Sequence, residues 1–228
     1  IKIEYKLGIL GGLGPLATAY FYEILTKKTK VNIDQEHLNL IILSHASTPD
    51  RTDYILDHTK ENPYKNLLED CKLLEKLGCK LISIPCNTAS YFTENLQKEI
   101  NIKISNMVQN TAKYINEKNY KTAVIMATTG TIKAKLYQTL LEKENIKCLF
   151  PNQENVMKMI YEYIKKGIDV PKNLWEETIK GINADCFILG CTELSILKKQ
   201  FNLEEKFIDP LEIEADKILD YFHKERLW

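Results

Sequence analysis

The sequence predicts an α/β protein with two similar lobes, each a mostly parallel sheet flanked by helices. Three observations indicate this class. Short β-rich runs alternate with amphipathic helical stretches, which is the pattern of βα units. A length of 228 residues suits one large unit, or two small ones that share a continuous core. Two strand-to-helix corners of the first half also recur, in the same order, in the second half.

The strands are expected where apolar and β-branched residues form short runs between turn residues. These runs cover residues 7–10, 39–43, 81–84, 103–105, 123–126, 148–150, 186–189 and 207–208. Helices are expected between them, where apolar residues recur at helical spacing. Residues 64–78 carry the stripe Leu67, Leu68, Cys71, Leu74 and Leu77. The last helix carries the stripe Leu211, Ala215, Ile218, Leu219 and Phe222.

The repeat pairs two kinds of corner. Residues 80–88 read KLISIPCNT and residues 185–193 read DCFILGCTE, each a buried strand, a Pro or Gly, a Cys and a polar pair. Residues 6–16, KLGILGGLGPL, match residues 121–132, KTAVIMATTGTI, in the same way. The offsets are 191 − 86 = 105 and 130 − 14 = 116, so the halves are about a hundred residues each. The repeat predicts one lobe of residues 1–104 plus 209–228 and another of residues 105–208, facing each other across a cleft.

Composition excludes several classes of partner. Lys plus Arg total 31 and Asp plus Glu total 31, so no charge surplus draws the chain to nucleic acid or an anionic membrane. The apolar runs 38–43 and 81–86 are far shorter than the roughly 18 residues of a membrane span. The polar start, residues 1–4, lacks the apolar core of a signal peptide. We expect a cytoplasmic protein that acts on a small molecule.

The six cysteines are expected to be reduced thiols rather than a disulfide framework, because no export signal is seen. Their spacing and the scattered histidines do not fit a metal site. Four of the cysteines are expected to be core residues, namely Cys71, Cys79, Cys148 and Cys186.

Cys86 and Cys191 differ from the others because both follow a strand at a repeated corner. Ligands of open α/β sheets bind outside the carboxyl ends of the strands, where these corners lie. Each cysteine is expected to precede a helix directly, and the helix dipole should then make the thiol unusually acidic. The polar residues that follow, Asn87, Thr88 and Thr192, are expected to cap these helices.

Two loops and two cations could bind an anion. Residues 12–17, GLGPLA, fit the loose dinucleotide pattern, but the second strand ends in SHAST with no acidic residue, which disfavours a nicotinamide cofactor. The amide-rich loop around Leu13 could hold a carboxylate or phosphate, and the segment that begins at Thr128 offers the same from the other lobe. Arg51, on a loop, and Lys165, ending a helix, are either carboxylate ligands or solvated surface charges.

At these residues the chain resembles the aspartate/glutamate racemase family, and within it the aspartate racemase branch. The matching motifs run in family order over nearly the whole chain. They are GILGGLGPLAT at 8–18, PDRTDYIL at 49–56, PCNTA at 85–89, ATTGT at 127–131, IYE at 160–162 with Ile164 and Lys165, and GCTE at 190–193.

The resemblance implies a racemase that needs neither PLP nor metal, with no cofactor, forming a homodimer with its site between the lobes. It implies that Cys191 and Cys86 are the acid/base pair, serving the α-protons of the L- and D-isomer respectively. Asn87, Thr88 and Thr192 would bind near the α-carboxylate and amino group. Arg51 and Lys165 would hold the side-chain carboxylate. Leu13 and Thr128 complete the expected substrate-binding set.

The expected activity is interconversion of L- and D-aspartate, with glutamate second, by proton transfer between paired cysteines. Two bases on opposite faces are the minimum needed to invert a carbon that bears hydrogen. Glutamate racemases have Asp-Ser-Gly and a His where this chain has Gly11-Gly12 and Glu193, which disfavours that branch. Leu13 replaces a common Met and Ser90 a common His, and which group assists each thiol stays open.

Two alternatives remain at this point. One is an enzyme of the same superfamily that acts on another acid, as a maleate isomerase, hydantoin racemase or decarboxylase. The other is a catalytically silent protein that binds an acidic amino acid.

Overall fold

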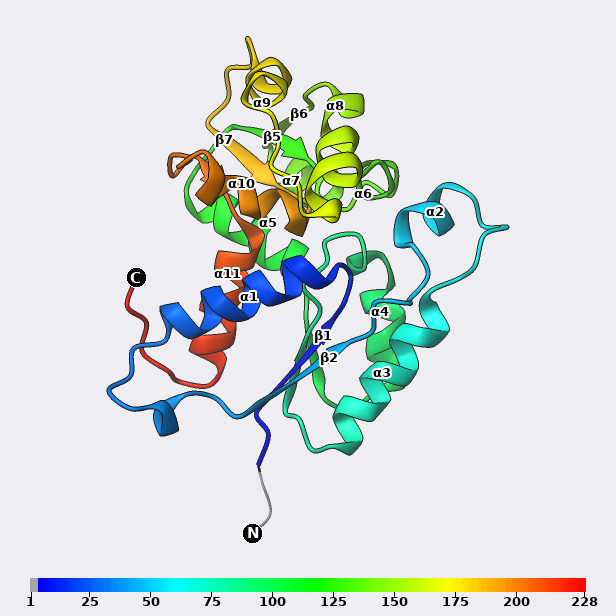
Figure 1. Cartoon of the computed structure of the whole chain (residues 1–228), viewed down its shortest axis with the longest axis vertical. Helices are drawn as coiled ribbons and strands as arrows, with labels where there is room; N and C mark the ends of the chain where they lie inside the picture. Colours follow the sequence, from blue (N-terminus) through cyan, green and yellow to red (C-terminus); the bar gives the residue numbers. More distant parts are fainter. Residues whose placement is uncertain (1–3) are drawn as a thin grey trace.

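The computed structural model describes residues 4–228 and contains two four-stranded parallel sheets, each flanked by helices. Figure 1 shows them as two lobes, one above the other, with the chain returning to the first lobe at its end. The predicted α/β class with two similar lobes is confirmed. Residues 1–3 lie outside the described part, and with them most of the polar start that argued against a signal peptide.

The first sheet has the strand order β2-β1-β3-β4. Its strands are β1 (Leu7–Gly11), β2 (Leu40–Ser44), β3 (Leu81–Ser83) and β4 (Lys103–Ser105). The helices around it are α1 (Pro15–Lys28), η1 (Asp34–Glu36), α2 (Arg51–Leu56), α3 (Tyr64–Lys76) and α4 (Ser90–Glu99). The start of α1 is favoured by Pro15 in its first turn, and its end by Lys27 and Lys28, which face the negative end of the helix dipole.

The second sheet repeats this order as β6-β5-β7-β8. Its strands are β5 (Thr122–Met126), β6 (Lys147–Leu149), β7 (Cys186–Leu189) and β8 (Phe207–Ile208). The remaining helices are α5 (Met107–Glu117), α6 (Thr129–Lys133), α7 (Gln138–Lys143), α8 (Gln153–Lys158), η2 (Met159–Tyr163), η3 (Ile164–Lys166), α9 (Lys172–Ile179), η4 (Thr192–Leu194), α10 (Ser195–Gln200) and α11 (Pro210–Tyr221). The shared order accounts for the repeat in the sequence, because equivalent corners follow equivalent strands.

The inner strands β1, β3 and β7 are buried along their whole length, and β5 is buried except at Thr122, as parallel strands covered on both faces should be. The expected strands agree with the observed ones to within one residue at each end. One detail of the helix stripes is wrong. Leu77 is 46% exposed because α3 ends at Lys76 and the chain turns away through Gly78, whose φ is +91°.

The C-terminal helix α11 joins the lobes by packing against both α1 and α5. Its Glu214 is fully buried, and the two carboxylate oxygens accept hydrogen bonds from different elements. Ser83 Oγ of β3 donates to Oε1 at 2.7 Å, and Asn110 Nδ2 of α5 donates to Oε2 at 2.8 Å. Because α11 contacts both sides, the division into residues 1–104 plus 209–228 and residues 105–208 stays a prediction.

Helix α2 also bridges the lobes, since it leaves the first lobe and packs against α6 (Figure 1). The approach is close, because a Cβ added to Gly130 would lie 2.9 Å from Thr52 Cα. Lys133 Nζ donates to Leu56 O at 3.2 Å across the same contact. Glycine at position 130 therefore lets the backbone of α6 meet α2 directly.

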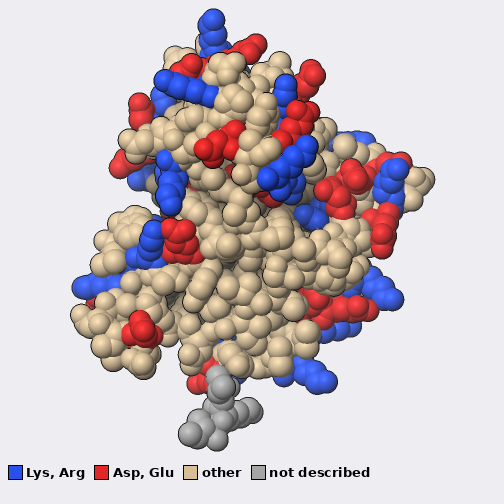
Figure 2. Space-filling view, viewed as in Figure 1, with Lys and Arg blue, Asp and Glu red and all other residues tan. Residues whose placement is uncertain are grey.

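Charged side chains are unevenly distributed on the face shown in Figure 2. They are frequent over the second lobe, whereas the surface over α1 and β2 carries few of them. No helix in residues 4–228 is long and apolar enough to cross a membrane.

The turn from β8 into α11 depends on Asp209, a carboxylate that is 2% exposed. Its Oδ1 accepts from Ser195 Oγ at 2.6 Å and from the Leu211 amide at 2.9 Å, which caps α11. Its Oδ2 has no hydrogen-bond partner among the described residues. Burial, assisted by the charge of Glu212, raises the pKa of Asp209 to about 6.

We predict that Asp209 makes folding stability fall as the pH rises from about 4 to about 7. The pKa is raised from 3.8 in the folded state, so folding favours the protonated acid, and the stabilisation is lost as pH passes 6. A shift of about two pKa units corresponds to roughly 3 kcal/mol. Urea unfolding should show that the free energy of unfolding of the wild type, relative to that of Asp209→Asn, falls by roughly 3 kcal/mol between about pH 4 and about pH 7.

Asp185→Asn is the control, because the contribution of Asp185 to stability should rise with pH instead of falling. The backbone N–H groups of Lys121 and Thr122 lower the pKa of the exposed Asp185. A difference between wild type and Asp209→Asn that does not vary with pH would contradict the prediction.

Candidate active site

All nine residues singled out in the sequence line one pocket between the lobes. The first lobe contributes Leu13, Arg51, Cys86, Asn87 and Thr88, and the second contributes Thr128, Lys165, Cys191 and Thr192. The pocket is lined mainly by polar and charged side chains and is partly open to solvent. The structure thus brings every expected residue together, while their individual roles stay predictions.

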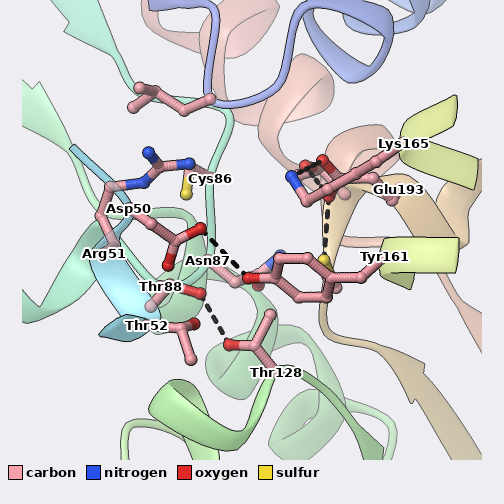
Figure 3. A pocket seen from close by; sticks show the side chains of 13 residues that line it. Asp50, Arg51, Thr52, Cys86, Asn87, Thr88, Thr128, Tyr161, Lys165 and Glu193 are labelled. Atoms are coloured by element: carbon pink, nitrogen blue, oxygen red, sulfur yellow. Dashed lines mark hydrogen bonds and ion pairs between the residues drawn. The ribbon is translucent and has the colours of Figure 1, made fainter. Parts of the chain in front are cut away.

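The pocket lies at the carboxyl ends of the strands, where open α/β sheets place their ligands. Leu13 follows β1, Cys86 follows β3, Thr128 follows β5 and Cys191 follows β7. The two cysteines therefore occupy equivalent corners after equivalent strands, one in each lobe. Figure 3 shows Cys86 beside Arg51 on one side of the pocket, with Lys165 and Glu193 on the other.

The expected helix caps are not found. The helix α4 begins only at Ser90, after a turn in which the Ser90 amide donates to Asn87 O at 3.1 Å, and its N-cap is Ala89. Cys191 precedes only the short 3₁₀ helix η4, of which it is itself the N-cap. The side chains of Asn87, Thr88 and Thr192 are therefore not used as caps and instead line the pocket.

The expected acidity of the thiols is wrong for Cys191. Burial raises its pKa well above the ordinary value, and the carboxylate of Glu193 raises it further, against the opposing charge of Lys165. Cys191 Sγ donates to Glu193 Oε2 at 2.9 Å. No full helix follows this corner directly, so the dipole effect assumed from the sequence is missing.

Lys165 forms an ion pair with Glu193, whose Oε1 lies 2.8 Å from Lys165 Nζ. The ammonium also lies 5.3 Å from the ring centroid of Tyr161. The π-helix η2 and the 3₁₀ helix η3 set its position, and Gly167, with φ +71°, ends that segment. Burial lowers the pKa of Lys165, but its interactions with Glu193 and Cys191 outweigh this effect, so the net shift is upward.

Arg51 is the first residue of α2 rather than part of a loop, and it is 8% exposed. Its Nη1 donates to Pro49 O at 3.1 Å, while its Nε has no partner in the described part of the chain. Burial lowers the pKa of Arg51, but its interactions with Cys86 and Asp50 give a net rise. A guanidinium this deeply placed is not a solvated surface charge.

Hydroxyl and amide groups form the floor between the lobes. Thr88 Oγ1 lies 2.9 Å from Thr128 Oγ1 and 3.0 Å from Thr131 Oγ1, so the contact crosses from one lobe to the other. Asn87 Oδ1 accepts from the Tyr137 hydroxyl, and Asn87 Nδ2 is buried without a partner in residues 4–228. These groups could donate to an anionic ligand in a site largely shielded from water.

Three lining residues were missed in the sequence, namely Asp50, Thr52 and Tyr161. Asp50 Oδ1 caps α2 by accepting from the Asp53 amide at 3.0 Å, and its Oδ2 accepts from the Tyr161 hydroxyl at 3.2 Å. Asp50 and Thr52 flank Arg51 in the sequence and Tyr161 precedes Lys165, so their place in these motifs is the signal that could have found them. Glu193 also lines the pocket, whereas Ser90 is not among the lining residues.

The described residues hold no cluster of three or more His, Cys, Asp or Glu side chains suited to a metal ion.

Comparison with known proteins gives a consistent result. The chain matches the family model for Asp/Glu/hydantoin racemase over residues 10–218. It is 27% identical over 212 residues to the broad specificity amino-acid racemase RacX of Bacillus subtilis, covering 89% of this chain and 92% of RacX.

Solved structures agree with the sequence match. Picrophilus torridus aspartate racemase superposes with a TM-score of 0.83 at 29% identity, covering 97% of this chain and 96% of that one. An aspartate racemase homologue from Pyrococcus horikoshii superposes with a TM-score of 0.73 at 25% identity, covering 97% of this chain and 99% of that one.

Proposed function

The chain belongs to the Asp/Glu/hydantoin racemase family and is an amino-acid racemase, and we propose that it interconverts L- and D-aspartate by two-base proton transfer between Cys86 and Cys191. The observation that carries the proposal is the pair of thiols in one pocket, at equivalent corners of opposite lobes. Racemization removes a proton from one face of Cα and delivers one to the other, so it needs a base and an acid on opposite sides.

The pocket offers a way to stabilise the carbanion that this reaction forms. Donors around the α-carboxylate would carry the negative charge as it develops, and buried donors do so without reorganising. Asn87 Nδ2 is such a donor, and the hydroxyls of Thr88 and Thr128 lie beside it in the pocket wall. We propose that these groups take the place of an electron sink, so that no cofactor is needed.

The charges favour a dicarboxylic substrate. Arg51 and Lys165 both line the pocket, and a guanidinium or ammonium binds a carboxylate through charge-assisted hydrogen bonds. Similarity to Picrophilus torridus aspartate racemase over nearly the whole chain supports aspartate, with glutamate second. RacX has broad specificity, so a wider range of amino acids is the second candidate.

The decisive experiment is proton NMR of L-aspartate and L-glutamate with the purified protein in D₂O. We expect loss of the Cα proton signal together with appearance of the D-isomer. A maleate isomerase or decarboxylase would change the carbon skeleton or its double bonds, a hydantoin racemase would need a hydantoin, and a silent binding protein would leave the Cα proton in place.

The cysteines should divide the work by enantiomer. In D₂O, Cys86→Ser should exchange the α-proton mainly of L-aspartate, and Cys191→Ser mainly that of D-aspartate, because one thiol remains in each variant. Both exchanges should be slow, because serine is a far weaker base than cysteine. Neither variant should complete racemization. Cys71→Ala and Cys148→Ala, outside the pocket, should keep the wild-type pattern apart from losses of stability. Racemization at the wild-type rate in either serine variant would return both thiols to a structural role.

Arg51→Ala and Lys165→Ala should each lower kcat/KM on aspartate by about one to two powers of ten. Losing one charged hydrogen-bond partner costs roughly 1.5 to 3 kcal/mol. Lys198→Ala is the matched control, because it removes an ion pair of 2.7 Å with Glu212 that lies outside the pocket. Unchanged kinetics in both pocket variants would rule out carboxylate recognition by these residues.

Racemization should survive dialysis against EDTA without any added cofactor, since the proposed chemistry uses only protein groups. Chiral chromatography of the product before and after dialysis measures this. Loss of activity that added metal restores, or a PLP absorbance band that tracks activity, would overturn the prediction.

The homodimer and the cytoplasmic location remain predictions from the sequence.

A further inference from the structure

Glu193 links the second thiol to a cation. It accepts from Cys191 Sγ through Oε2 at 2.9 Å and pairs with Lys165 Nζ through Oε1 at 2.8 Å. Glu193 is 3% exposed and Cys191 6%, so both interactions are shielded from water. A Cβ added to Gly14 of the opposite lobe would lie 3.3 Å from Glu193 Oε1, so the glycine loop closes over this pair.

The geometry has a consequence for the proton on Cys191. A thiol can donate its S–H to a carboxylate at 2.9 Å, whereas a thiolate at this distance would face a second negative charge. Lys165 keeps Glu193 in the ionised form that accepts the bond. Burial raises the pKa of Glu193, but Lys165 and the hydrogen bond from Cys191 lower it by more, so the net shift is downward.

We propose that Glu193 is a positioning residue that holds Cys191 as the neutral thiol, which makes Cys191 the proton donor of the resting enzyme. This inference rests on the two-thiol reaction proposed above. Cys86 has a different partner, because the charged group beside it is Arg51 (Figure 3). The two corners share a backbone plan but carry opposite charges next to their thiols.

The proton balance of the first turnover follows. The Cα–H bond of D-aspartate breaks, its proton passes to the Cys86 thiolate, and the electron pair stays on Cα. The S–H bond of Cys191 breaks, and its proton adds to the opposite face of Cα to give L-aspartate. Cys86 is then a thiol and Cys191 a thiolate. The carboxylate of Glu193 disfavours that thiolate, so it promotes return of a proton to Cys191.

Other groups around Cys191 do not replace Glu193. The phenols of Tyr137 and Tyr161 interact with Cys191, but burial raises the pKa of each above its ordinary value, so neither adds a charge near pH 7. Lys165 opposes Glu193 and favours the thiolate. The protonation of Cys191 therefore depends on its burial and on the balance between Glu193 and Lys165, with Cys86 across the pocket.

The test is alkylation by iodoacetamide, with each cysteine followed by peptide mass spectrometry over a range of pH. The ratio of the Cys191 rate to the Cys86 rate corrects for opening of the pocket, because both thiols line it. Glu193→Gln should raise this ratio about tenfold near neutral pH, the change expected for one pKa unit.

Glu212→Gln is the matched control, since it breaks the ion pair with Lys198 outside the pocket and should leave the ratio unchanged. Glu193→Asp keeps the charge on a shorter side chain and should fall between wild type and Glu193→Gln. If the reagent does not reach Cys191, the thiolate absorbance of each variant, taken as a difference from its Cys191→Ser counterpart, should show the same order.

An alkylation ratio that Glu193→Gln leaves unchanged would overturn the inference. Titration of the thiol needs no turnover. If aspartate proves not to be the substrate, the alkylation result still stands, whereas a failed titration with intact racemization refutes only the role of Glu193.

Discussion

The packing of α11 between α1 and α5 is the constraint on which the site depends. A parallel sheet presents its ligand-binding side only at the carboxyl ends of its strands, so two sheets make one pocket only if those ends face each other. Buried Glu214 fixes this orientation by bonding Ser83 of β3 and Asn110 of α5. Breaking one of these bonds would leave a buried carboxylate unsatisfied, which is costly in a dry interior.

Contacts on the other side of the molecule complete the pocket. The direct approach of Thr52 to Gly130, the bond from Tyr161 to Asp50 and the hydroxyl contact between Thr88 and Thr128 all cross from one lobe to the other. These contacts place polar groups in a buried region, where hydrogen bonds and charges act more strongly than in water. Donors preorganised in such a region can stabilise negative charge that develops on a bound ligand.

The two halves repeat in backbone but differ in chemistry. The residue two positions after the cysteine is Thr88 in the first lobe and Glu193 in the second. A hydroxyl contributes no charge, whereas a buried carboxylate changes the protonation of its neighbours. Lys165 offsets this charge from η3, and Arg51 stands beside Cys86 from α2. A nearly symmetric scaffold thus holds an asymmetric set of charges.

The α/β class, the positions of the strands and nine of the residues around the pocket could be predicted from the sequence. These depend on local hydrophobic patterns and on a repeat that can be read along the chain. The pairing of Cys191 with Glu193 and Lys165, the burial of Arg51 and the roles of Asp50 and Tyr161 were decided only by tertiary structure. The helix caps and the acidity of Cys191 were wrong for the same reason. Burial and distance between segments far apart in the sequence set the charge of a side chain, and no local pattern records them.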